Sequence, residues 1–136
     1  MYEYFEHTAD LGIRVRGEDM PTLFVEAATA LFAALIENLD EVEPVVHRDL
    51  TIKADRLDDL LHDWLADLLA IYDADRFIAC RFEVRETDEG LTATIHGEPV
   101  NPDRHIAADE IKAITYHGLT VEKTDQGYVA EVIVDL

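Results

Sequence analysis

The sequence predicts an α+β fold, a two-layer sandwich with two amphipathic helices on one face of a mostly antiparallel sheet, a mixed sheet being the alternative. Three observations support this prediction. Two long stretches carry apolar residues at helical spacing, most of the remainder alternates apolar and polar residues, and short turn segments connect neighbouring alternating runs. With 136 residues the chain suits a single domain, 1–136, and is too short for two.

The first third of the chain predicts two strands and a helix. Alternation turns Tyr2 and Tyr4 inward in the first strand, and Ile13 and Val15 inward in the second. The helix begins at Pro21, which suits a first helical turn because its missing N–H would have no partner there. A broad apolar stripe follows, made of Leu23, Phe24, Ala27, Ala28, Leu31, Phe32, Leu35 and Ile36.

A third strand, around Leu50 and Ile52, precedes the second helix. We expect Asp55 to be the N-cap of this helix, because a carboxylate there can accept the free N–H groups of the first turn. The apolar residues that follow recur at spacings of three and four and are Leu57, Leu60, Leu61, Trp64, Leu65, Leu68, Leu69 and Tyr72. The opposite face of the helix is acidic and is expected to be solvated.

The last part of the chain predicts four more strands. Their inward residues are Cys80, Phe82 and Val84, then Leu91, Ala93 and Ile95, then Leu119 and Val121, then Val132 and Val134. Gly90 after Asp88-Glu89 predicts one hairpin, and Asp125-Gln126-Gly127 predicts another. Between these hairpins, the stretch from Pro99 to Asp109 has no helical or strand period and is either a functional loop or a simple crossover.

The acidity of the chain has two interpretations. Thirty Asp and Glu residues against eleven Lys and Arg give a formal net charge of −19, which is typical of proteins that bind cations or basic partners and of surfaces adapted to high salt. We favour salt adaptation, because ~1 M salt shortens the Debye length to about 3 Å and screens carboxylate repulsion. Direct, tight binding of RNA or DNA is not expected, since no basic cluster is longer than Arg14-Val15-Arg16.

The absence of certain residue types and motifs from the sequence excludes several functions. The chain has no serine nucleophile, its six glycines are scattered and form no phosphate loop, and Cys80 alone cannot form an internal disulfide. No apolar run resembles a signal peptide or approaches the ~20 residues that span a bilayer. We therefore expect a cytoplasmic protein without a membrane segment, and a monomer because no heptad repeat is present.

The most informative segments are His7-Thr8-Ala9-Asp10, Glu110 to His117, and the final pair Asp135 and Leu136. Each places polar groups at a strand end, and such ends can lie together in a small domain. Asp10, Asp135 and the α-carboxylate of Leu136 would offer oxygen ligands to Ca²⁺ or Mg²⁺ if the first and last strands were neighbours. On spacing alone, an ordinary turn aspartate and a free chain end are favoured.

Three further residues could belong to such a site. His7 could be a metal ligand, a general base, or a turn histidine bonded to a carbonyl, which is the commonest case. Lys112 could meet a phosphate or a partner's carboxylate, or it could be an ordinary edge-strand charge. Alternation predicts that, of Tyr116 and His117, one is packed and one exposed.

Taken together, these segments resemble the archeases, a family of small acidic cytoplasmic proteins. The resemblance covers essentially the whole chain through Phe5–Ile13, Ala27-Ala28 and Phe32, Asp63–Leu65, Ile111–His117 and Val132–Leu136. It implies a non-catalytic protein cofactor of tRNA splicing that acts on an RtcB-type RNA ligase, which joins 2′,3′-cyclic phosphate ends to 5′-hydroxyl ends. Such a cofactor would promote guanylylation of the ligase histidine, allow multiple turnover, and broaden nucleotide use beyond GTP.

The resemblance also implies site residues. The family binds a divalent cation, typically calcium, at positions that correspond to Asp10, Asp135 and Leu136, with Mg²⁺ or Mn²⁺ as alternatives. The family's lysine corresponds to Lys112. We place Lys112, His7 and His117 on the side that faces the partner or its nucleotide, and we expect no catalytic residue.

Two other functions stay open. The first is a chaperone or adaptor for RNA-modifying enzymes such as a tRNA methyltransferase, which requires an exposed apolar patch that the sequence does not indicate. The second is a small metal-dependent hydrolase that uses His7, Asp10 and His117, for which no nucleophile is evident.

Overall fold

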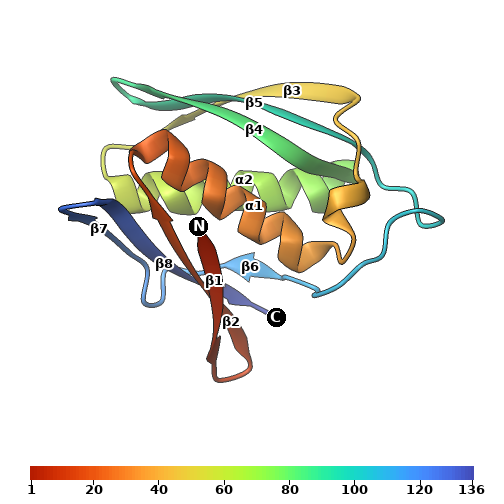
Figure 1. Cartoon of the computed structure of the whole chain (residues 1–136), viewed down its shortest axis with the longest axis horizontal. Helices are drawn as coiled ribbons and strands as arrows, with labels where there is room; N and C mark the ends of the chain where they lie inside the picture. The colour runs from red at the N-terminus through yellow and green to blue at the C-terminus, as the bar shows by residue number, and fades with distance from the viewer.

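The computed structural model describes residues 1–136 and contains two helices between two antiparallel sheets (Figure 1). The elements are β1 (Tyr2–His7), β2 (Asp10–Gly17), α1 (Met20–Leu35), the 3₁₀ turn η1 (Leu39–Glu41), β3 (Val46–Lys53), α2 (Leu57–Asp75), β4 (Phe77–Thr87), β5 (Gly90–Pro99), β6 (Ala113–Ile114), β7 (Thr120–Thr124) and β8 (Gly127–Asp135). The predicted α+β class, with two helices and antiparallel strands, is confirmed. Neither helix is both long and apolar enough to cross a membrane.

The strands divide into two sheets, which the alternation of apolar and polar residues did not predict. One sheet has the order β1-β2-β8-β6, with β7 also paired to β8, and the other has the order β3-β5-β4. Both helices contact strands of both sheets. Helix α1 shows why the helices lie between two sheets. Ten of its 16 residues are buried, and so wide an apolar surface must be covered on two sides.

The two helices begin in different ways. Asp19 is the N-cap of α1, where its side chain accepts the N–H of Thr22 at 2.8 Å, and Pro21 lies in the first turn as predicted. The predicted N-cap of α2, Asp55, is wrong, because Arg56 occupies that position without a side-chain hydrogen bond. Asp58 instead accepts the N–H of Asp59 within the first turn, at 2.9 Å. A carboxylate three residues later thus takes part of the role expected of Asp55.

Both predicted hairpins are present, with Thr87 opposite Gly90 and Thr124 opposite Gly127. Alternation fails in β4, where a β-bulge follows Ala79, and Cys80 is half-buried instead of fully inward. This burial raises the pKa of the Cys80 thiol. Gly97 lies against the bulge, and a Cβ there would be 1.7 Å from the carbonyl oxygen of Ile78.

The long connection between β5 and β6 is anchored by Glu98, a buried carboxylate at the end of β5. Glu98 accepts the N–H of Glu43 at 2.6 Å and the guanidinium of Arg104, and the Nε2 atom of buried His105 lies 3.4 Å away. Burial alone would raise the pKa of Glu98, but these donors outweigh it and the pKa is lowered. The connection therefore has a fixed path that delivers the chain to β6.

Candidate functional site

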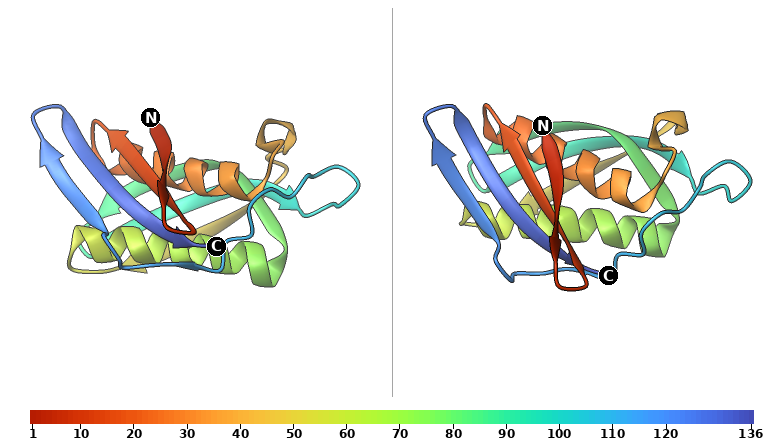
Figure 2. Two further views of the ribbon diagram at one scale, coloured as in Figure 1. Left: turned by 90° about the horizontal axis from the view of Figure 1, so that it is seen from below. Right: turned by 60° about the horizontal axis from the view of Figure 1, so that its bottom comes forward.

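The β1–β2 turn and the end of the chain lie side by side (Figures 1 and 2). The antiparallel register of β2 and β8 runs from Gly17 opposite Tyr128 to Leu11 opposite Val134. One further step in this register places Asp10 opposite Asp135. The strand pairing therefore brings together two carboxylates that are far apart in the sequence.

The face on which these carboxylates lie follows from alternation. Ile13 and Val15 of β2 and Val132 and Val134 of β8 are buried in the core against the helices. Asp10 and Asp135 occupy the opposite parity in their strands and share the outer face of the sheet. Because Leu136 directly follows Asp135, its α-carboxylate lies at the same end.

The β1–β2 turn is strained. It has two residues, Thr8 and Ala9, between the opposed pair His7 and Asp10, and their φ angles are +31° and +67°. Such turns normally use Asn or Gly, because a side chain with a Cβ is disfavoured at positive φ. This strained turn lies between the candidate residues His7 and Asp10. Backbone strain of this kind is often found at functional sites.

His7 lies beside Asp10 within this turn. Its Nδ1 atom is 3.7 Å from an Asp10 carboxylate oxygen, is itself buried, and has no hydrogen-bond partner. The ring of His117 approaches to 5.2 Å between centroids. The structure therefore brings together His7, Asp10 and His117, three of the residues that the sequence indicated.

His117 reaches this position because the segment after β6 is bonded to β8. The backbone N–H and the hydroxyl of Thr115 both donate to the carbonyl of Ile133, at 3.1 and 2.9 Å. The N–H of His117 in turn donates to the Thr115 hydroxyl oxygen at 3.2 Å. These three hydrogen bonds hold the segment after β6 over the sheet.

Lys112 lies next to the chain end, just before β6. Its backbone N–H donates to the carbonyl of Asp135 at 2.7 Å. Lys112 is exposed and lines a hollow of about 280 Å³ together with Ala66 and Leu69 of α2.

Tyr116 and His117 are both exposed, so the prediction that one of them is packed is wrong. Tyr116 stacks on His62 of α2, with ring centroids 3.8 Å apart and planes inclined by 13°. No pattern in the sequence indicated His62 at this position. The stack depends on how α2 and the segment after β6 approach each other, and that approach is set by the sheet.

The donor set suits a hard cation in its chemistry. Asp10, Asp135 and the α-carboxylate of Leu136 offer only oxygen atoms, which Ca²⁺ and Mg²⁺ prefer. The expected set contains only two side chains, and no group of three or more His, Cys, Asp or Glu side chains is arranged to hold a metal. The fit of this site to a cation therefore depends on the α-carboxylate as the third donor.

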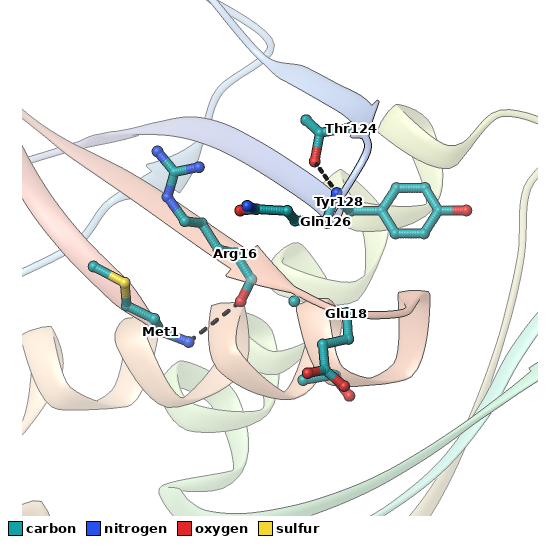
Figure 3. Close-up of a pocket in the computed structure, with 8 residues that line it drawn as sticks. Met1, Arg16, Glu18, Thr124, Gln126 and Tyr128 are labelled. Carbon is teal, nitrogen blue, oxygen red and sulfur yellow. Dashed lines mark hydrogen bonds between the residues drawn. The ribbon is translucent and has the colours of Figure 1, made fainter.

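A separate cavity of about 310 Å³ lies at the opposite end of β2 and β8 (Figure 3). None of the predicted site residues contributes to it. The residues that line it are Met1, Arg16, Gly17, Glu18, Thr22, Thr124, Gln126 and Tyr128.

Comparison with known proteins gives the following matches. Residues 2–136 match the Archease protein family (MTH1598/TM1083). The chain is 42% identical over 139 residues to protein archease of Methanopyrus kandleri, covering 99% of each chain. It is 36% identical over 140 residues to protein archease of Pyrococcus abyssi, covering 99% of this chain and 98% of that one.

Two solved structures are also similar. The solution structure of Methanobacterium thermoautotrophicum protein 1598 matches with a TM-score of 0.83 at 33% identity, covering 99% of this chain and 98% of that one. The crystal structure from Thermotoga maritima, described as an archease and possible chaperone, matches with a TM-score of 0.70 at 21% identity. It covers 100% of this chain and 98% of its own, and the similarity concerns the fold.

Proposed function

Because the chain belongs to the archease family, we propose that it is a non-catalytic protein cofactor in tRNA splicing. It promotes guanylylation and multiple turnover of an RtcB-type RNA ligase and broadens the nucleotides that the ligase uses. The observation that supports this proposal most is the pairing of β2 with β8, which runs as far as Leu11 opposite Val134, one residue before Asp10 and Asp135. Carboxylates from both ends of the chain are thereby presented together on one exposed face.

The residues that would hold a divalent cation are Asp10, Asp135 and the α-carboxylate of Leu136, with calcium expected and Mg²⁺ or Mn²⁺ as alternatives. A cation bound there would supply positive charge close to phosphate oxygens. The protein's own contribution is to hold these oxygen atoms in place through strand pairing. His7 and His117, beside Asp10, face the same side and would contact the ligase or its nucleotide.

Lys112 has a different role in this proposal. Its backbone is bonded to Asp135 at the chain end, and its side chain is exposed. It is therefore suited to an ion pair with a phosphate or with a carboxylate of the ligase. The net charge of −19 would speed the encounter with a basic ligase surface at low salt, an effect that high salt would screen.

The test combines ligase kinetics with cation binding. Purified RtcB-type ligase is assayed for single-turnover guanylylation and for multiple-turnover ligation, with the wild-type chain, with Asp10→Asn, or with Asp125→Asn. Asp125 lies in the β7–β8 turn, at the far end of the same sheet, and serves as the matched control. We expect Asp10→Asn to lower multiple turnover at least about tenfold and to weaken calcium binding by calorimetry, with Asp125→Asn unchanged.

Two results would contradict the proposal. One is a wild-type chain that leaves guanylylation of the ligase unchanged. The other is full stimulation by Asp10→Asn, which would separate the ligase role from the carboxylate site. Melting temperatures of all variants show that a loss of stimulation is not a loss of fold.

A second candidate is a chaperone-like modulator of an RNA-modifying enzyme such as a tRNA methyltransferase. It is supported by the description of the Thermotoga maritima protein as a possible chaperone and by the exposed pair Val45 and Val46 at the start of β3, which are 67% and 45% exposed. Suppression of aggregation of the methyltransferase, lost in a Val45→Asp/Val46→Asp variant without any effect on the ligase, would favour it.

A further inference from the structure

Tyr116 and His62 form a rigid platform at the surface between α2 and the segment after β6. Both ring nitrogens of His62 are held by oxygen atoms, Nε2 at 3.0 Å from the carbonyl of Ile114 and Nδ1 at 3.1 Å from Asp63. The His62 side chain is only 15% exposed, whereas Tyr116 is 58% exposed. One face of the Tyr116 ring is thus fixed against His62, and the ring is open to solvent on its other side.

The surroundings of this platform are negative. Asp58 and Asp59 lie one turn before His62 on α2 and Asp63 directly follows it. Together with partial desolvation, their charges raise the pKa of Tyr116. The one cation beside them is Arg56, which bonds Asp58 at 2.9 Å and approaches Asp59 only to 4.0 Å. Three carboxylates against one guanidinium leave an unbalanced negative charge at the edge of the ring.

This combination selects among possible partners. A nucleic acid could stack a base on Tyr116, but its phosphates would be repelled by the nearby carboxylates and by the net charge of −19. A lysine ammonium would be attracted, but it has no flat face to stack. A guanidinium is planar, stacks on aromatic rings, and can donate to a carboxylate at the same time.

We propose that the Tyr116–His62 platform is a docking site for an arginine side chain on a basic segment of a protein partner. The guanidinium lies over the open face of Tyr116 and directs its N–H groups toward Asp59 or Asp63. Because His62 holds the ring in place before binding, little side-chain entropy is lost when the arginine docks. The inference does not depend on the ligase proposal, since the platform contains none of the residues assigned there.

The test uses the full chain and two short peptides, Ac-Gly-Arg-Gly-Arg-Gly-NH₂ and its lysine counterpart, with dissociation constants from NMR titration of the aromatic ring signals. We expect the arginine peptide to bind about threefold to fivefold more tightly than the lysine peptide. Tyr116→Leu should remove this preference, and Tyr116→Phe should retain it because the ring is kept. Tyr128→Leu, in the separate cavity at the start of β8, is the matched control and should retain it as well.

A second pair of variants tests the carboxylates. Asp63→Asn keeps an oxygen for the His62 ring but removes the charge, and it should weaken arginine binding more than Asp125→Asn does. Equal binding of the two peptides, or a preference that survives in Tyr116→Leu, would mean diffuse attraction to an acidic surface and would overturn the proposal. Tighter binding of hexa-adenylate than of the arginine peptide would assign the platform to RNA and overturn it too.

Discussion

At the scale of single residues, the β1–β2 turn shows how local strain and site geometry are linked. Thr8 and Ala9 adopt positive φ angles that glycine or asparagine would adopt more easily. A two-residue turn of this kind opposes His7 and Asp10 directly, whereas a longer turn would shift their register. The strain is sustained because all six residues of β1 pair with β2.

This strain can be measured. Ala9→Gly should raise the free energy of unfolding by about 1 kcal/mol, because glycine has no Cβ to clash at a φ of +67°. The measurement is urea denaturation followed by circular dichroism. Ala113→Gly is the control: Ala113 is an exposed strand residue without positive φ, and the variant should be destabilised by about 0.5–1 kcal/mol. A loss of stability in Ala9→Gly would refute the account of the turn.

The residues of the candidate site differ in how far they could be predicted. The second strand, and not the first, is the neighbour of the last strand, and its pairing with β8 ends one residue before Asp10 and Asp135. The position of Lys112 could not be predicted, because β6 has only two residues and is too short to show a period. The structure shows it through the bond from the N–H of Lys112 to the carbonyl of Asp135.

At the scale of elements, the N-caps of the two helices show what local sequence predicts about a helix start and what it does not. Both Asp19 and Asp55 precede apolar stripes and both are good N-cap residues. Only Asp19 caps its helix, where the bond to Thr22 lowers the pKa of Asp19. At α2 the chain enters one residue later, and Asp58 accepts the N–H of Asp59 and the guanidinium of Arg56.

The two positions therefore form a natural pair for mutation. Asp19→Ala should lower the melting temperature by roughly 2–5 °C, since the first turn of α1 loses its acceptor, whereas Asp55→Ala should change it by less than about 1 °C. Differential scanning calorimetry at pH 7 gives both values. Because the folded-state pKa of Asp19 is depressed, its contribution is complete above the unfolded-state pKa and is lost as the pH falls through the folded-state pKa. Equal effects of the two variants would show that the Asp19 cap is unimportant.

At the scale of the whole molecule, charge is the dominant unusual feature. A formal charge of −19 on 136 residues leaves most carboxylates without a cationic partner, because only eleven Lys and Arg are available. Like charges at this density oppose the compact state more than the expanded one. The fold is held against this repulsion by one core of 33 buried hydrophobic residues shared by the helices and both sheets.

Salt should therefore stabilise this protein. We expect the urea midpoint to rise by on the order of 0.5–1 M between 0.05 M and 2 M KCl, because screening weakens carboxylate repulsion. The triple variant Asp59→Asn/Asp63→Asn/Asp67→Asn removes three charges that recur at i, i+4 on α2 and should gain less from salt than the wild type. A midpoint that stays constant or falls with KCl would exclude salt adaptation as the reason for the acidity.

The sequence by itself determined the helices, both hairpins and the α+β class, because each depends on local patterns, and it determined the family through motifs spread over the whole chain. Apolar spacing follows from the helical and strand periods, and turn residues act through their own φ preferences. The distribution of the strands over two sheets and the bulge at Cys80 could not be predicted in this way.

Only the tertiary structure decided which distant segments meet. Arg14 and Glu131 form an ion pair across 117 positions of sequence, and the same pairing of β2 with β8 brings Asp10 to Asp135. The Tyr116–His62 stack likewise needs α2 and the segment after β6 to be fixed by a shared core. Such contacts depend on burying apolar surface from the whole chain at once, and no local pattern in the sequence contains that information.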